Sequence, residues 1–173
     1  IFMAEPFYAR YNSSFAQTAK FDDVAKQFIL LEKKARDTTS GLLYHAWDES
    51  KAMAWSNPIT GCSPSFWSRS VGWYAMGLVD VLDYFPTTHP KRDSLVKIFQ
   101  RFATAIVKYQ DPTSGLWYQV TDKGNSAGNY LEGSGSSMFV YALAKGARKG
   151  YIDPALWKKA KIGYDGIVSS FVS

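Results

Sequence analysis

Three segments of the chain alternate apolar and polar positions with the period of an amphipathic helix. Segment 21–35 places apolar residues three and four positions apart, and segments 92–109 and 154–171 repeat this pattern. The last of them opens on Pro154, which suits a first helical turn, and Asp153 stands before it in the position of an N-cap. We expect these three segments to be outer helices that keep one side in water.

Two further segments have few charges and many small residues along most of their length. They are 68–85 and 133–150, and both are apolar around nearly the whole helical circumference. Segment 1–11, which reads IFMAEPFYARY, has the same character. We expect these three to be inner helices, so that the order along the chain is inner helix, outer helix and loop, repeated.

A turn motif recurs between the helices. The stretch DTTSGLLY begins at Asp37, and DPTSGLWY begins at Asp111. Asp suits the first position of a turn, and Gly41 and Gly115 follow where a positive φ is expected. The aromatic, β-prone residues after each glycine predict a short strand.

Alternating inner and outer helices with long loops at one end describe an all-α fold, the α/α toroid, as one domain over 1–173. Three hairpins make half of a six-hairpin ring, the (α/α)6 barrel. A half-ring leaves an apolar side of its terminal inner helices uncovered. We therefore expect a partner to cover it, from preceding sequence or from another chain.

Composition narrows the function classes. The net charge is +5 and the basic residues are scattered on expected outer helix faces, which does not favour nucleic acid. No apolar run has the length of a membrane span. Cys62 is the single cysteine, so an internal disulfide and a cysteine-based metal site are excluded. Aromatic residues make up 16%, a weak indication of sugar binding.

The candidate chemistry is densest in SPSFWSRSVGWYAMG, 63–77. Ser63 or Ser65 is expected to cap the following helix. Arg69 and Trp73 are four residues apart and share a helical face, with Trp67 beside them. A guanidinium flanked by indole rings suits a carboxylated sugar. The alternative is a structural arginine paired with a buried carboxylate, Asp48 or Glu132.

His45 lies on the first predicted strand, next to Trp47 and Asp48. It is either a hydrogen-bonded structural histidine or a group that binds or orients substrate. No second histidine stands at ligand spacing, since His89 lies in the turn before an outer helix. A zinc site is therefore not expected.

Three carboxylates lie near the expected mouth of the cavity: Asp48, Glu49 and Glu132. A glycosidase needs a pair, but spacing alone selects none. Glu132 is either one of that pair or a helix cap. The GSGSS that follows it lacks the lysine of a phosphate-binding loop.

The blocks FMAEPFYARY, SGLLYHAWDES, FWSRSVGWYAMGLVDVLDYFP and NYLEGSGSSMFVYALAKGARKGYI resemble the unsaturated rhamnogalacturonyl hydrolases of glycoside hydrolase family 105. The resemblance covers nearly the whole chain. It implies an (α/α)6 barrel of about twice this length, of which 1–173 would be the C-terminal portion. It also implies release of an unsaturated uronic acid from pectin-derived oligosaccharides by hydration of the C4–C5 double bond, without metal or cofactor.

Carried over from the family, His45, Trp67, Arg69 and Trp73 match positions that contact the unsaturated uronate, and Met3 matches a pocket-lining position. The family's general-acid Asp falls two residues before Ile1. The 173 residues alone are therefore expected to contain no catalytic acid and to be inactive. The resemblance leaves the compartment open between cytoplasm and periplasm.

Two other classes remain open. A non-catalytic carbohydrate-binding or scaffold toroid also accounts for an aromatic cavity mouth without a carboxylate pair. An α-solenoid for protein contacts predicts a broad concave face, but it does not account for the Trp67, Arg69 and Trp73 cluster.

Overall fold

The computed structural model describes residues 1–172, and within this range the chain is all helical. The helices are α1 Glu5–Ser14, α2 Phe21–Ala35, α3 Ser68–Tyr84, α4 Arg92–Ile106, α5 Gly133–Arg148 and α6 Trp157–Phe171. Short 3₁₀ turns lead into α2 and α6 and extend α4; they span Thr18–Lys20, Pro154–Leu156 and Val107–Tyr109. The predicted helices are confirmed, although α1 begins at Glu5 rather than at the first residue.

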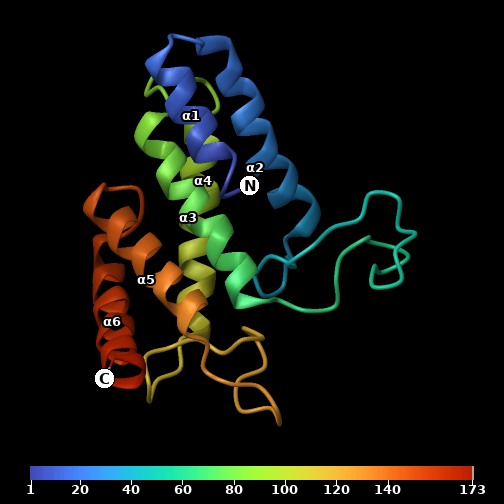
Figure 1. Ribbon diagram of the computed structural model, residues 1–173, viewed down its shortest axis with the longest axis vertical. Helices are drawn as coiled ribbons and strands as arrows, with labels where there is room; N and C mark the ends of the chain where they lie inside the picture. Colours follow the sequence, from blue (N-terminus) through green and yellow to red (C-terminus); the bar gives the residue numbers. More distant parts are fainter. Residues whose placement is uncertain (173) are drawn as a thin grey trace.

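The helices form three antiparallel hairpins in two layers (Figure 1). Helices α1, α3 and α5 contact one another in that order and form the inner layer, while α2 and α4 contact each other on the outer side. Helix α6 packs against α5. The two long loops, 36–67 and 110–132, lie at the same end of the bundle. This arrangement is the one expected of an α/α toroid.

The core lies between the two layers and is rich in aromatic rings. Its largest fully buried side chains include Trp117, Phe21, Phe28, Phe99, Phe102 and Phe139. Phe102 contacts rings of the inner layer, Tyr74 of α3 and Phe139 of α5, with centroids 6.4 and 6.1 Å away. The outer helices therefore bury the stripe that their periodicity predicted.

Helix α1 is buried on one side only. Its outward face exposes Met3, Phe7, Tyr11 and Phe15, which stand four residues apart and are between 47% and 85% exposed. Consecutive rings along this face lie tilted against one another, with centroids 6.3 Å apart for Phe7 and Tyr11 and 4.6 Å apart for Tyr11 and Phe15. An exposed apolar stripe of this kind is what a terminal inner helix of a half-ring presents.

The repeated turn has the same geometry at both sites. The Asp37 carboxylate accepts from the Ser40 amide at 2.7 Å, and Asp111 accepts from the Ser114 amide at 2.7 Å. Gly41 and Gly115 have φ of 76° and 74°, as predicted. Hydrogen bonds from Ser40 hold the pKa of Asp37 below its usual value. Each turn therefore depends on an ionised aspartate at its first position.

The prediction of a short strand after each of these turns is wrong. Within the described residues the segments form isolated bridges, Arg36 to Leu43, Trp47 to Cys62, Trp67 to Val120 and Tyr118 to Leu131. Successive amides find acceptors in different segments: Tyr44 donates to Ala35 at 2.8 Å and Asp48 to Gly61 at 2.8 Å. A ladder cannot extend when neighbouring residues have no common partner strand.

Gly115→Ala is expected to lower the free energy of unfolding by about 3 kcal/mol. A Cβ at this position would lie 2.6 Å from the Ile162 carbonyl oxygen, so backbone contact adds to the cost of a positive φ. Urea unfolding of the full-length gene product measures the change. Gly150→Ala is the matched control, because Gly150 has a similar φ of 71° but nothing within 4 Å of its Cβ site; about 1 kcal/mol is expected. Equal losses in the two variants would contradict the tight contact between α6 and the turn.

An ion-pair network joins α3 to α5. Lys145 Nζ lies 2.6 Å from Asp80 Oδ1 and 2.6 Å from Asp83 Oδ2, and its side chain is 10% exposed. Tyr141 donates to Asp80 at 2.7 Å, and Lys149 pairs with Asp83 at 3.2 Å. Burial opposes the charge of Lys145, but the two aspartates outweigh it and raise its pKa. Burial likewise acts against ionised Asp83, and the lysines still hold its pKa below the usual value.

Lys145→Met is expected to lower the free energy of unfolding by about 2–3 kcal/mol at neutral pH, because it leaves Asp80 without its cation and Asp83 with Lys149 as its remaining cation. The raised Lys145 pKa stabilises the fold below pH 10.5 and the lowered Asp83 pKa stabilises it above pH 3.8, so the loss should be largest between these values. Urea unfolding across this pH range measures it. Lys161→Met is the control, since its pair with Asp165 is exposed at 63% and 57%. A pH-independent difference would contradict the network.

Candidate functional site

The predicted site residues gather where α3 and α5 begin, at the end of the bundle that carries the long loops. Helix α3 begins at Ser68 because the residue before it, Trp67, has extended backbone and pairs with Val120. The Ser68 amide donates to the Gln119 carbonyl at 2.9 Å, and its hydroxyl donates to the Tyr118 carbonyl at 2.6 Å. Loop 110–132 thus fixes the first turn of α3.

The predicted capping of this helix by Ser63 or Ser65 is wrong. No side chain caps α3, and both serines hold His45 instead. His45 Nδ1 lies 2.9 Å from the Ser65 carbonyl oxygen and 3.0 Å from Ser63 Oγ. A carbonyl only accepts, so Nδ1 carries the proton and Nε2 is left as an acceptor. His45 is exposed, and its free nitrogen can therefore receive a hydrogen bond from a ligand.

Arg69 lies between a ring and a carboxylate. Its guanidinium is 5.5 Å from the Trp67 ring centroid, and its Nη2 is 3.2 Å from Glu132 Oε1. The side chain of Arg69 is 45% exposed and that of Glu132 is 4% exposed. Trp67 also meets His45 edge to face, with centroids 6.1 Å apart. His45, Trp67 and Arg69 therefore form one continuous surface.

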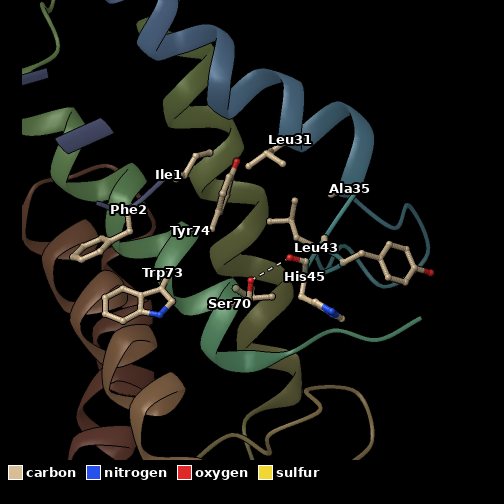
Figure 2. A pocket seen from close by; sticks show the side chains of 12 residues that line it. Ile1, Phe2, Leu31, Ala35, Leu43, His45, Ser70, Trp73 and Tyr74 are labelled. Carbon is tan, nitrogen blue, oxygen red and sulfur yellow. Dashed lines mark hydrogen bonds between the residues drawn. The ribbon is translucent and has the colours of Figure 1, made fainter. Parts of the chain in front are cut away.

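A pocket of about 230 Å³ adjoins this surface, shown in Figure 2. His45, Ser70 and Trp73 line it from loop 36–67 and α3, and Ile1 and Phe2 line it from the start of the chain. Trp73 is 42% exposed, and its ring packs at a tilt against Phe2 with centroids 4.5 Å apart. An apolar cavity with a few polar groups at its rim is the usual form of a small-ligand site.

Met3 lies outside this pocket. Its side chain is 85% exposed on the outward face of α1, and its neighbour Phe2 takes the place beside Trp73. The structure thus brings His45, Trp67, Arg69 and Trp73 together and leaves Met3 at the edge.

Two of the carboxylates near the mouth, Asp48 and Glu132, are held by hydrogen bonds of the fold, whereas Glu49 is exposed. Asp48 accepts from the Met53 amide at 3.0 Å and from Ser50 Oγ at 2.7 Å, and these bonds lower its pKa to about 2. Glu132 caps α5 by accepting from the Ser134 and Gly135 amides, which fulfils the capping alternative. Asp48 is therefore a poor proton donor at neutral pH.

Sequence reasoning missed three contributors to the site. Phe2 packs against Trp73, Ser70 donates to the His45 carbonyl at 3.3 Å, and Ser63 orients the His45 ring. Ser70 carried a usable signal, because it lies one residue from Arg69 and three from Trp73. Phe2 and Ser63 carried no such signal in the sequence, because their partners Trp73 and His45 are distant along the chain.

Residues 1–172 contain neither a metal-binding cluster nor a membrane-spanning helix. No cluster of three His, Cys, Asp or Glu side chains is placed to hold a metal ion there. His45 and His89 flank opposite ends of α3, and His89 accepts from the Lys91 amide at 3.2 Å. None of the described helices has the length and apolarity to cross a bilayer.

Comparison with known proteins places these features in a family context. The family profile described as Glycosyl Hydrolase Family 88 matches residues 1–173. A solved glycoside hydrolase of family 105 from C. acetobutylicum superposes with a TM-score of 0.96 at 49% identity, covering 98% of this chain and 47% of that chain.

Two curated relatives are also similar to the chain. Protein Atu3128 of Agrobacterium fabrum is 38% identical over 150 residues, which are 87% of this chain and 63% of the relative. The unsaturated rhamnogalacturonyl hydrolase YesR of Bacillus subtilis is 32% identical over 143 residues, 83% of this chain and 38% of the relative. The chain thus spans between about a third and two thirds of these relatives.

Proposed function

The chain belongs to glycosyl hydrolase family 88, and from this membership we propose that it forms the substrate-binding half of an (α/α)6-barrel enzyme. The enzyme would release an unsaturated galacturonic acid from the non-reducing end of pectin-derived oligosaccharides. The similarity to YesR, an unsaturated rhamnogalacturonyl hydrolase, supports this substrate class. The observation that carries the proposal is that Arg69, which lies against the Trp67 ring, stands one helical turn before Trp73, and Trp73 lines the pocket together with His45.

Each residue of this arrangement has a role in binding the uronate. The uronate carboxylate would pair with the exposed edge of the Arg69 guanidinium. The sugar ring would stack on the exposed Trp73 indole, and His45 Nε2 would accept from a sugar hydroxyl. Because Ser65 and Ser63 hold the His45 ring, its acceptor needs no reorganisation when the sugar binds.

The reaction we propose is hydration of the C4–C5 double bond. A general acid protonates C4, water adds at C5, and the resulting hemiketal opens and releases the neighbouring sugar. We place the acid outside the 173 residues, at an Asp preceding Ile1. Asp48 and Glu132 are engaged in hydrogen bonds of the fold, which supports this placement.

Loss of the ultraviolet absorbance of the C4–C5 double bond tests the proposal. The full-length gene product is expected to consume Δ-galacturonosyl-rhamnose, and the 173 residues alone are not. Turnover by the 173 residues would overturn the placement of the acid. A full-length product that is inert, and that binds unsaturated and saturated disaccharides with equal affinity in calorimetry, would instead favour a non-catalytic carbohydrate-binding toroid.

A further inference from the structure

Among residues 1–172, Glu132 is the buried acid that contacts Arg69 of the candidate site, and the proposed reaction gives it no role. Its carboxylate lies at the start of α5 and reaches across to Arg69 in the first turn of α3. The two residues are 63 positions apart in the sequence. Glu132 therefore joins the starts of two inner helices at the point where substrate is expected.

The first turn of α5 also holds the Glu132 carboxylate. Oε1 accepts from the Ser134 hydroxyl at 2.6 Å and from the Ser134 amide at 3.3 Å, and Oε2 accepts from the Gly135 amide. The Glu132 amide donates to the Trp117 carbonyl at 2.8 Å. With backbone and carboxylate both fixed, Glu132 has a single orientation toward Arg69.

The close approach of the two helix starts depends on Gly135. A Cβ there would lie 2.7 Å from Glu132 Oε2 and 3.0 Å from the Ser68 carbonyl carbon. Glu132 is thus packed against the backbone that carries Arg69, and not merely near its flexible end. This packing sets the distance from the carboxylate to the guanidinium.

Arg69 is held on one edge and open on the other. Within residues 1–172 its only hydrogen bond runs from Nη2 to Glu132 Oε1, and the Trp67 ring lies against the guanidinium. Guanidinium carries five N–H donors, so most of them remain available to a ligand. The fixed edge belongs to the protein and the exposed edge is turned to the solvent.

We propose that Glu132 is a positioning residue, which orients Arg69 so that the free edge of its guanidinium meets the substrate carboxylate. The inference rests on the proposed function. A free arginine side chain loses rotamer freedom when it binds a carboxylate, whereas Arg69 is already ordered by Glu132 and Trp67. Glu132 would therefore strengthen uronate binding without touching the sugar.

Glu132→Asp tests this role in the full-length gene product. Aspartate is a good N-cap, so α5 keeps its start, but the carboxylate withdraws from Arg69 by one methylene. KM for Δ-galacturonosyl-rhamnose is expected to rise about 3–10-fold with little change in kcat, as expected for releasing one ordered side chain. For the methyl ester of the same disaccharide, which lacks the anionic charge, the rise should be smaller.

A double-mutant cycle separates positioning from helix capping. In an Arg69→Met background, Glu132→Asp is expected to change KM no further, because the group that it positions is gone. Glu132→Gln keeps the chain length and a capping oxygen but removes the charge, and a rise in KM in the same direction is expected. This variant serves if Glu132→Asp does not fold.

The outcomes separate the positioning role of Glu132 from the proposed hydrolase function on which it rests. An active wild type with unchanged KM in both Glu132 variants overturns the inference alone. An equal KM rise for the acid and its ester, or a further rise in the Arg69→Met background, also overturns it. An inert wild type overturns the proposed function and the inference with it.

Discussion

Replacing Arg69 with methionine is expected to lower kcat/KM of the full-length gene product for Δ-galacturonosyl-rhamnose by about 100-fold. Hydrogen bonds between ionised groups contribute about 1.5–3 kcal/mol, and Arg69 lies one helical turn before Trp73, which lines the pocket. The rate at which the double-bond absorbance disappears measures the effect. Methionine preserves much of the apolar stem that packs along the helix.

The fold is expected to survive this change. Glu132 loses its partner, but the Ser134 and Gly135 amides still hold its carboxylate. A thermal unfolding midpoint close to that of the wild type would show this. Arg148→Met is the matched control, since Arg148 lies exposed in the last turn of α5 and should leave kcat/KM unchanged.

Arg69→Lys refines the same test. Lysine keeps the positive charge but loses the planar fork of donors, so an intermediate loss of about 10-fold is expected. An Arg69→Met enzyme with wild-type kcat/KM would contradict the assignment of Arg69 to the uronate carboxylate. An Arg69→Met enzyme that is less stable but keeps its kcat/KM would contradict this assignment as well.

Trp117→Ala is expected to lower the free energy of unfolding by about 4–5 kcal/mol, a larger effect on stability than that of any other substitution proposed for this chain. The side chain is fully buried and packs edge to face on Phe139, with centroids 5.3 Å apart. Its Nε1 donates to the Ile106 carbonyl at 2.9 Å at the end of α4. Truncation would leave a large cavity and an unsatisfied carbonyl group.

Trp117→Ala should weaken substrate binding at the candidate site as well as the stability of the core. The Trp117 carbonyl accepts from the Glu132 amide at 2.8 Å, and the Trp117 amide donates to Ser136 Oγ at 3.0 Å. Loosening Trp117 therefore loosens the start of α5 and the hold of Glu132 on Arg69. Urea unfolding and the KM for the unsaturated disaccharide measure the two effects.

Two control variants separate the contributions of Trp117. Trp117→Phe keeps most of the ring but loses the indole donor, and about 1–2 kcal/mol is expected. Trp157→Ala removes a ring that is 50% exposed and should cost about 1 kcal/mol or less. A Trp117→Ala variant no less stable than Trp157→Ala would contradict the central position of Trp117 in the core.

The sequence by itself determined the helices and the repeated turns. Its periodicity predicted α2 and α4 nearly to the residue, because the spacing of apolar residues decides which helical face is buried. The positive φ of Gly41 and Gly115 followed from the repeated turn motif, since only local sterics set it. The four-residue spacing of Arg69 and Trp73 was enough to place both on one side of α3.

Only the tertiary structure decided which groups meet across the chain. The aromatic stretches after the turns have the composition of strands, yet their amides bond to separate segments and form single bridges. Ser63 was expected to cap a helix and holds His45, and Glu132 both caps α5 and pairs with Arg69. These hydrogen-bond and ion-pair partners depend on the distance at which the inner helices pack, and a local pattern of residues does not determine that distance.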